Sequence, residues 1–183
     1  MSPLIRPVHD ADAPAIVAIY AREVLERAAT FELEPPDEAE FVARIEAVRG
    51  HGLPWLVAEL DGRVAGYAYL SPFRLRPAYR YCVELSVYIA EDAQRRGVGS
   101  ALMEALIAVG RREGLRHLIG AIGDSANSGS IALHRRAGFR EVGVYRQVGW
   151  KFDRWVDVVL MQLDLTPEGS PPEGPGLGLP GRS

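Results

Sequence analysis

The chain lacks several features that would place it in a particular class of protein. Its single cysteine, Cys82, cannot form a disulfide within one copy of the chain. No apolar run reaches the roughly 18 residues that a membrane-spanning helix needs. The N-terminal sequence, MSPLIRPVHDAD, has neither the charged segment nor the apolar run of a secretory signal. These absences predict a cytoplasmic protein without a membrane partner.

An excess of basic residues is also missing. The 183-residue chain carries a net charge of −3 at pH 7 and has a pI near 5.8. Nucleic-acid binders usually show a basic bias, so we expect no nucleic-acid partner. With 48% hydrophobic and 25% charged residues, the composition is that of one ordinary globular domain with enough apolar side chains for a core.

The last residues differ from the rest in composition. Residues 166–183, TPEGSPPEGPGLGLPGRS, are mostly Pro, Gly, Ser and Glu. Such a segment buries too little apolar surface to offset the entropy lost on ordering. The sequence therefore predicts a domain over residues 1–165 and a flexible C-terminal tail over residues 166–183. If the tail is ordered, the domain surface or a neighbouring chain must hold it.

Within residues 1–165, apolar periodicity predicts alternating strands and helices. Helices are expected after Asp10, after Pro35, from Val98 and before Gly138. Asp61-Gly62 predicts a tight hairpin turn. The aromatic-rich residues 147–155 are expected to form a connection. Strands are expected at residues 4–8, 55–60, 64–70, 83–89, 118–122, 139–145 and 156–165.

The stretch from Tyr81 to Leu106 organises the chain. A strand-like apolar run is followed by Gln94-Arg95-Arg96-Gly97-Val98-Gly99, which opens a helix. Backbone N–H groups at a helix N-terminus favour an anion, and glycine lets the backbone approach it. The turn lacks the lysine of a P-loop, and Leu102 stands where a dinucleotide fingerprint has its third glycine. Taken alone, the turn is equally compatible with a phosphate site and with a simple strand–helix connection.

Several charged or polar residues allow both a structural and a functional interpretation. Glu84 is the one acid in a β-branched strand, and it either faces solvent or serves as a buried base. The loop at residues 71–80 carries three arginines and is either solvated or an anion-binding wall, because a guanidinium binds a carboxylate through two parallel hydrogen bonds. Spacing alone favours core packing for Phe31, a helix cap for Asn127 and a partly buried helix position for His134.

Two spaced motifs identify a family. Gln94-x-x-Gly97-x-Gly99 resembles the acyl-CoA pyrophosphate motif of the GCN5-related N-acetyltransferase (GNAT) superfamily. Asn127-x-x-Ser130-x-x-Leu133-His134-x-x-x-Gly138-Phe139 resembles the second cofactor motif of that superfamily. The order of the expected elements also matches over roughly residues 3–165. The resemblance implies an α/β (α+β) fold with a mixed, mostly antiparallel central sheet flanked by helices, in which a splayed strand pair holds acetyl-CoA.

Other residues narrow the resemblance to one subfamily. The stretch from Val83 to Ile89, VELSVYI, is similar to that of the phosphinothricin and methionine sulfoximine acetyltransferases, and so are residues 133–139 and 147–157. In many other superfamily members a tyrosine occupies the position of His134. The subfamily acetylates the α-amino group of small, glutamate-like amino acids and is associated with antibiotic and herbicide resistance. The resemblance thus implies an acyltransferase with acetyl-CoA as co-substrate and no metal, and a homodimer.

The resemblance also implies a set of site residues. An amino-acid amine must lose a proton before it attacks a thioester, so Glu84 is the candidate general base. His134 is the second catalytic candidate, for orienting the substrate, relaying a proton or protonating the departing thiolate. Acetyl-CoA would be bound by Val87, Tyr88, Ile89, Arg95, Arg96, Gly97, Val98, Gly99, Ser100, Asn127 and Ser130. The amino-acid substrate would contact Phe31, Arg74, Leu75, Arg76, Glu84, Leu85 and Ser86.

Three other functions stay open from the sequence. The first is acetylation of another amine or of a peptide N-terminus. The second is non-catalytic binding of acetyl-CoA, and the third is phosphate or nucleotide binding without acyl transfer. The arginines of residues 71–80, together with Glu84 and His134, favour a small anionic amino acid over a peptide N-terminus, and the other two functions stay open.

Overall fold

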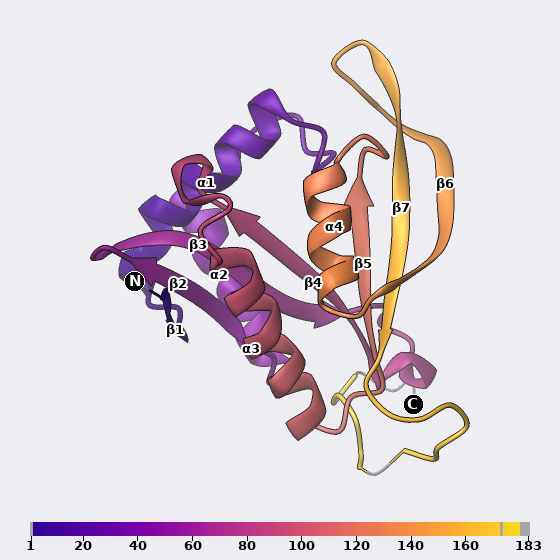
Figure 1. Cartoon of the computed structure of the whole chain (residues 1–183). Coiled ribbons are helices and arrows are strands. Elements are labelled where there is room, and N and C mark those ends of the chain that lie inside the picture. The colour runs from indigo at the N-terminus through magenta and orange to yellow at the C-terminus, as the bar shows by residue number, and fades with distance from the viewer. Residues whose placement is uncertain (1, 173, 180–183) are drawn as a thin grey trace.

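The protein forms one seven-stranded sheet with four α-helices, in a computed structural model that describes residues 2–172 and 174–179 (Figure 1). The strand order is β1-β2-β3-β4-β5-β7-β6, and only β4 and β5 are parallel neighbours. The mixed, mostly antiparallel sheet expected from the sequence is therefore confirmed. The strands are β1 (Leu4–Pro7), β2 (Trp55–Leu60), β3 (Arg63–Pro72), β4 (Cys82–Ile89), β5 (His117–Gly123), β6 (Arg140–Lys151) and β7 (Arg154–Asp164). The helices are α1 (Ala13–Glu26), α2 (Glu38–Gly50), α3 (Val98–Arg112) and α4 (Ser128–Arg136).

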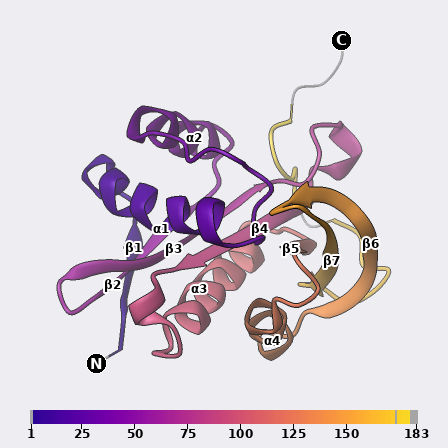
Figure 2. The same cartoon turned by 90° about the horizontal axis from the view of Figure 1, so that it is seen from above.

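The helices cover the sheet from both sides. Seen from above, α1 and α2 lie on one face, and α3 and α4 lie on the other (Figure 2). Tyr67 of β3 packs edge-on against Phe41 of α2, with 6.3 Å between the ring centroids. Helices α1 and α2 cover β2, β3 and β4, so this layer ends beside β5. In the described part of the chain, no helix combines the length and the apolar character needed to cross a bilayer.

The parallel strands β4 and β5 pair only where they begin. The paired residues are Cys82–Glu84 of β4 and His117–Ile119 of β5. Beyond this point β4 continues along β3 as far as Ile89, while β5 continues along β7. The two strands therefore diverge, as Figure 1 shows. One edge of β4 is left without a partner strand, and its N–H and C=O groups are available to an extended ligand.

The helix caps and the hairpin turn expected from the sequence are present in the structure. The side chain of Asp37 accepts a hydrogen bond from a backbone N–H in the first turn of α2, at 2.8 Å. Asn127 caps α4 in the same way, at 3.2 Å. Asp61 and Gly62 both have positive φ, at 52° and 77°, which is the geometry of the expected hairpin turn. These predictions are confirmed because each depends on only a few neighbouring residues.

The prediction of a connection at residues 147–155 is wrong, because most of this stretch belongs to the β6–β7 hairpin. The turn consists only of Phe152 and Asp153, with φ of 52° and 53°. A bulge between Tyr145 and Gly149 interrupts the β6–β7 register, and Gln147 within it has φ of 52°. None of these three positive-φ positions carries a glycine, so the usual turn signal was absent from the sequence.

Two contacts fasten the hairpin to the rest of the domain. Asp157 of β7 accepts hydrogen bonds from the Gln147 N–H at 2.9 Å and from the Ser125 hydroxyl at 3.0 Å. Lys151 is buried and donates from Nζ to the Thr30 carbonyl oxygen, just beyond α1, at 2.8 Å. The bulge is thus pinned at its centre, and the tip of the hairpin is tied to the end of α1.

The described part of the C-terminal tail contacts the surface of the domain. The Leu177 side chain is 9% exposed and packs with the core. Its N–H donates to the Arg80 carbonyl oxygen at 2.8 Å, and the Tyr81 hydroxyl donates to the Gly174 carbonyl oxygen at 2.8 Å. The domain surface therefore holds residues 166–172 and 174–179, while Glu173 and residues 180–183 of the expected tail lie outside the described residues.

Candidate functional site

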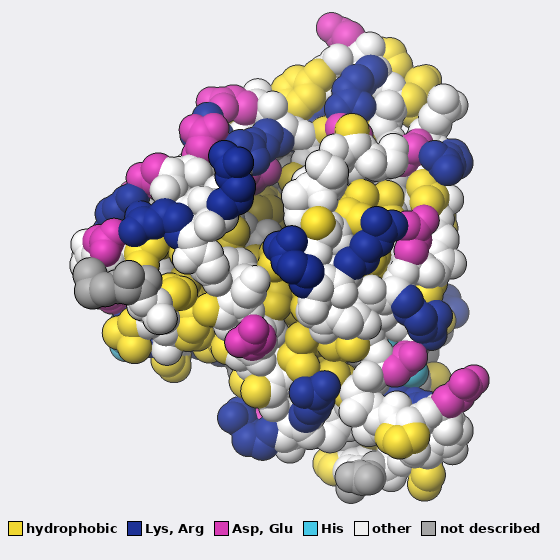
Figure 3. All heavy atoms as spheres, viewed as in Figure 1, with side chains coloured by type: hydrophobic (Ala, Val, Ile, Leu, Met, Phe, Trp, Pro, Cys, Tyr) yellow, Lys and Arg dark blue, Asp and Glu magenta, His cyan; other side chains and the backbone are white. Residues whose placement is uncertain are grey.

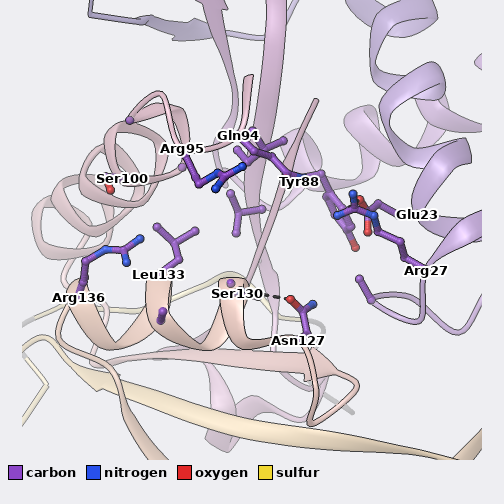
Figure 4. A pocket seen from close by; sticks show the side chains of 17 residues that line it. Glu23, Arg27, Tyr88, Gln94, Arg95, Ser100, Asn127, Ser130, Leu133 and Arg136 are labelled. Atoms are coloured by element: carbon purple, nitrogen blue, oxygen red, sulfur yellow. Dashed lines mark hydrogen bonds and ion pairs between the residues drawn. The ribbon is translucent and has the colours of Figure 1, made fainter. Parts of the chain in front are cut away.

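A pocket of about 420 Å³ lies where α3 and α4 begin, beside the free edge of β4. We call it the helix-end pocket. Its walls come from β4, the turn before α3, the first turns of α4 and the end of α1 (Figure 4). Nine of the eleven residues expected to bind acetyl-CoA line it: Val87, Tyr88, Ile89, Arg95, Gly97, Gly99, Ser100, Asn127 and Ser130.

The other two expected residues lie elsewhere. Arg96 forms an ion pair with Asp61 at 2.8 Å. The Val98 side chain is 1% exposed and packs in the core, because α3 turns this position toward the sheet. The sequence motif therefore located the turn, but it did not separate the residues that face the pocket from those that do not.

The helix-end pocket is suited to a polyanion. The first N–H groups of an α-helix have no intrahelical acceptor, and the helix dipole makes this end positive. Gly97 precedes α3 with φ of 84°, a conformation that glycine adopts readily. Arg27, Arg95 and Arg136 add three positive charges. In the space-filling view, Lys and Arg side chains gather around the hollow on this face (Figure 3). Backbone donors and guanidinium groups together favour phosphate groups.

The second glycine of the turn has a packing role. A Cβ atom at Gly99 would lie 3.0 Å from a methyl carbon of Leu133. Glycine at this position thus allows the N-terminal ends of α3 and α4 to approach each other closely. By contrast, no atom lies within 4 Å of a Cβ built at Gly97, so that glycine serves the backbone conformation.

Arg27 and Arg136 line this pocket but were not predicted from the two sequence motifs. Arg136 shares a helix face with Gly129 and Leu133, so helical spacing within the second motif could have identified it. Arg27 follows α1 and has no local signal. Its guanidinium lies 3.7 Å from a carboxylate oxygen of Glu23, whose burial raises the pKa of that carboxyl group above its usual value.

A second cavity of about 580 Å³ lies against the face of β5 and β7 that α4 does not cover. We call it the Glu84 cavity. Its wall is mostly apolar, with Ile119, Ala121, Val158 and Leu160 from the sheet and Tyr145 from β6. Glu84 and Arg74 bring charge to it. Burial in this wall raises the pKa of the Glu84 carboxyl group above its usual value, and the nearby positive charge of Arg74 acts in the opposite direction. The cavity thus combines a desolvated carboxylate with a cation.

Two of the seven expected substrate contacts, Arg74 and Glu84, line this cavity. Leu85 faces the core, because successive strand residues point to opposite faces of a sheet. The remaining expected contacts lie outside the cavity wall: Leu75 and Arg76 are exposed, Phe31 packs against Gly149, and Ser86 lies opposite Tyr69 in the β3–β4 register. The sequence missed Tyr145, Tyr81 and Arg116, which line the cavity from other elements.

Cys82 also lines the Glu84 cavity. Burial, with a further contribution from the Glu84 charge, raises the pKa of its thiol to about 11. The thiol is therefore protonated near pH 7, which is the unreactive form. Among the described residues, no group of three or more His, Cys, Asp and Glu side chains is placed to hold a metal ion.

His134 belongs to α4 and is 3% exposed. Its Nδ1 atom lies 2.9 Å from the Ser130 carbonyl oxygen, and its ring meets Phe139 edge-on at 5.1 Å. Burial lowers the pKa of the imidazole, so the ring is neutral with Nδ1–H donating to Ser130. The Nε2 atom is buried and has no hydrogen-bond partner in the described part of the chain. It therefore presents a free lone pair.

The two catalytic candidates approach the strand divergence from opposite faces of the sheet. A Cβ atom at Gly120 would lie 2.8 Å from Nε2 of His134, so the imidazole rests directly on this residue. Gly120 is the first β5 residue beyond the segment paired with β4. Its neighbour Ile119 faces the Glu84 cavity, so by alternation Gly120 faces α4. Glu84 and His134 thus do not line one cavity.

The comparisons with known proteins agree with this architecture. Residues 5–160 match the sequence profile of the acetyltransferase (GNAT) domain. The chain is 52% identical over 163 residues to the phosphinothricin N-acetyltransferase of Alcaligenes faecalis, covering 88% of this chain and 82% of that one. It is 42% identical over 173 residues to the L-methionine sulfoximine/L-methionine sulfone acetyltransferase of Pseudomonas aeruginosa, covering 94% and 100% of the two chains.

A solved structure extends the agreement to three dimensions. The crystal structure of a GNAT phosphinothricin acetyltransferase from Sinorhizobium meliloti, in complex with acetyl-CoA, has a TM-score of 0.90 and 40% identity, and 95% of each chain is covered. The profile match spans most of the sheet and includes every residue that lines the helix-end pocket and all but Gln162 of those that line the Glu84 cavity. The chain therefore belongs to the GNAT family and is an acyltransferase.

Proposed function

We propose that the protein transfers the acetyl group of acetyl-CoA to the α-amino group of a small, glutamate-like amino acid. Phosphinothricin, methionine sulfoximine and methionine sulfone are the candidate acceptors, after the names of the relatives at 52% and 42% identity. The observation that carries the proposal is the Glu84 cavity, in which a desolvated carboxylate and a guanidinium stand where β4 and β5 diverge. Such a carboxylate is a suitable proton acceptor for an ammonium group.

The residues of the helix-end pocket fit the chemistry of acetyl-CoA. N–H groups of the turn at residues 95–100 would bind its pyrophosphate, with Arg95 and Arg136 supplying positive charge. The unpaired edge of β4 at Val87–Ile89 would hydrogen-bond the amide groups of its pantetheine as an added strand does. When bound, acetyl-CoA supplies the activated acetyl group as a thioester.

In this proposal, Glu84 removes the proton that prevents an amino-acid ammonium from attacking. The neutral nitrogen then forms a bond to the acetyl carbon, and the bond from that carbon to sulfur breaks. Free N–H groups of β4 near Ser86 and Val87 would stabilise the negative charge on the acetyl oxygen. After the attack the nitrogen loses a second proton, and this proton passes to the departing thiolate, so that the products are the N-acetyl amino acid and CoA.

We propose a different role for His134 from that of Glu84. Its proton resides on Nδ1 and is engaged with Ser130, and burial disfavours a second proton. The ring is thus a poor donor to a thiolate, but its free Nε2 is a good acceptor. His134 would orient an amide or a water molecule at the point where the strands diverge. Of the three roles considered from the sequence, this protonation state supports orientation and proton relay.

The experiment that tests the proposed function measures CoA release from acetyl-CoA against a panel of amines. The panel contains L-phosphinothricin, L-methionine sulfoximine, L-methionine sulfone, proteinogenic amino acids, polyamines and short peptides. Saturable release with the first three acceptors is expected. Saturable release with peptides alone would favour N-terminal acetylation, and acetyl-CoA binding without release for any amine would favour a binding module.

Two of the three arginines in the loop at residues 73–80 are expected to behave differently. Arg74 lines the Glu84 cavity, whereas Arg76 is exposed outside it. Arg74→Ala is expected to raise the KM for the amino acid about tenfold or more, since a charge-assisted hydrogen bond is lost. Arg76→Ala is the matched control and should leave this KM within about twofold. Equal effects of the two substitutions in steady-state assays would contradict the assignment.

We also propose a homodimer formed through the β6–β7 hairpin. Val148, Trp150 and Trp155 are each more than half exposed, an unusual exposure for neighbouring large apolar side chains. Burial of these side chains against a second copy would remove them from water. Light scattering after size exclusion is expected to give twice the chain mass for the parent and one chain mass for Trp150→Asp/Trp155→Asp. A monomeric parent at micromolar concentration would contradict the proposal.

A further inference from the structure

We propose that the C-terminal tail is a strap that positions the wall of the Glu84 cavity, and thereby sets the affinity for the amino-acid acceptor. The strap is defined as residues 166–172 and 174–179. The part of the proposal that concerns the acceptor depends on the proposed function, because it takes the Glu84 cavity as the acceptor site. Tyr81 and Arg116 line the cavity, and the side chains of both donate hydrogen bonds to backbone carbonyl oxygens of the strap.

The strap lies directly on the residues that precede β4. The Tyr81 hydroxyl donates to the Gly174 carbonyl oxygen, and the Leu177 N–H donates to the Arg80 carbonyl oxygen, each at 2.8 Å. Gly176 has φ of 67°, and a Cβ atom there would lie 2.8 Å from the Arg80 carbonyl oxygen. The backbone of the strap therefore approaches Arg80 so closely that only glycine fits at this position.

A second set of contacts holds Arg116 at the start of β5. Its Nη1 donates to the Pro167 carbonyl oxygen at 2.9 Å and to the Ser170 carbonyl oxygen at 3.3 Å. The Arg116 N–H donates to the Tyr81 carbonyl oxygen at 2.8 Å. Tyr81, Arg116 and the strap thus form one hydrogen-bonded unit on the outer side of the cavity wall. Without the strap, the Arg116 guanidinium would lose these acceptors and be free to turn.

The same unit extends to the arginine loop. The Arg80 side chain donates to the Pro77 carbonyl oxygen at 2.9 Å, which closes the short turn at Pro77–Tyr79. Tyr79 of that turn packs edge-on against Phe73, with ring centroids 5.7 Å apart. Arg74 follows Phe73 and stacks on its ring at 5.2 Å. A displacement of the strap would therefore be transmitted to Arg74, which lines the Glu84 cavity together with Arg116.

Two leucines explain how a segment so rich in Pro and Gly is held. Leu177 is buried in the core, and Leu179 packs against it. Burial of a leucine side chain contributes about 1.5–3 kcal/mol. The prolines reduce the entropy that the segment loses when it docks, because they restrict the undocked chain. The strap can therefore dock with only two large apolar anchors.

The test compares Gly176→Val with Gly178→Val. A Cβ atom at Gly176 collides with Arg80, whereas a Cβ atom at Gly178 has no neighbour within 4 Å. The first readout is the labelling rate of Cys82, the single cysteine, which lines the same cavity. Gly176→Val is expected to speed labelling by a thiol reagent about tenfold as the wall opens, and Gly178→Val to leave the rate unchanged. Equal Cys82 labelling rates in the two variants would contradict the proposal that the strap positions the cavity wall.

The second readout is kinetic. With L-methionine sulfoximine as acceptor, Gly176→Val is expected to raise KM about fivefold or more while kcat and the Kd for acetyl-CoA stay within about twofold. Faster labelling with an unchanged KM would overturn the positioning role. Faster labelling in a protein that acetylates none of the amines would support the strap and refute the proposed function. If Gly176→Val does not fold, as judged by circular dichroism, Leu177→Ala replaces it, because this substitution removes a buried side chain of the strap without a collision. The same changes in labelling rate and KM are then expected.

Discussion

Replacement of Glu84 by Gln is expected to lower kcat by about 10²- to 10⁴-fold, because the amide cannot accept the proton of the ammonium group. The Kd for acetyl-CoA should stay within about twofold, since Glu84 lies in the Glu84 cavity and not in the helix-end pocket. Steady-state rates and a cofactor titration measure the two quantities separately. Glu104→Gln, an exposed change on α3, is the control and should leave both unaltered.

The pH dependence gives an independent check on Glu84. Burial raises the pKa of its carboxyl group, and only the unprotonated form can act as a base. Activity should therefore be lost on acidification at a pH above the range in which an ordinary glutamate titrates, and it should be retained at higher pH. The residual activity of Glu84→Gln should lack this acidic limb. A limb that persists in the variant would assign the titration to another group and remove Glu84 as the base.

Substitution of Gly120 by Ala is expected to lower both stability and turnover. The added Cβ would lie 2.7 Å from Cδ2 of His134. The ring cannot easily move, because Nδ1 is bonded to the Ser130 carbonyl oxygen and the ring packs edge-on with Phe139. Overpacking of this kind costs about 1–3 kcal/mol of unfolding free energy. Turnover should fall about tenfold or more, as the imidazole is displaced from the strand divergence. Chemical denaturation and steady-state kinetics measure the two effects.

A double substitution separates the two consequences of this clash. Gly120→Ala combined with His134→Ala removes the collision, so stability should recover relative to Gly120→Ala alone. Turnover should stay low, because the imidazole is gone. Gly143→Ala is the matched control, since no atom lies within 4 Å of a Cβ at that strand position. A Gly120→Ala variant with the stability and turnover of the parent would show that the ring is not held as described.

Much of the fold followed from short stretches of sequence. The Asp61-Gly62 turn, the Asn127 cap and the glycine turn before α3 each depend on backbone geometry within a few residues. Apolar periodicity located the seven strands and four helices of the described residues, although the ranges that it predicts for β6 and β7 leave out the residues next to their shared turn. The two strand lengths were mispredicted because Gln147, Phe152 and Asp153 adopt positive φ without glycine. The Gln147 N–H bonds to the Asp157 side chain of the adjacent strand, which no local signal indicates.

The candidate site followed from the sequence only in part. The two motifs located most of the helix-end pocket, because its backbone donors belong to two continuous helix starts. Arg27 could not be located, because its contribution depends on where α1 ends relative to β4. Arg74 and Arg76 are equivalent in sequence and both are exposed, and packing of the loop alone makes the first, and not the second, line the Glu84 cavity.

The sequence by itself determined the family, the order of the elements and the turns that carry glycine at Gly62 and Gly97, because local conformation and apolar periodicity are encoded within a few residues. The tertiary structure decided which side chains share a cavity. Strand alternation separates Glu84 from Leu85, but only the parallel pairing of β4 with β5 places Glu84 and His134 on opposite faces of one strand divergence. It also decided that the tail contacts the domain, because the Leu177 N–H and the Gly174 carbonyl oxygen bond to Arg80 and Tyr81, which lie far earlier in the chain.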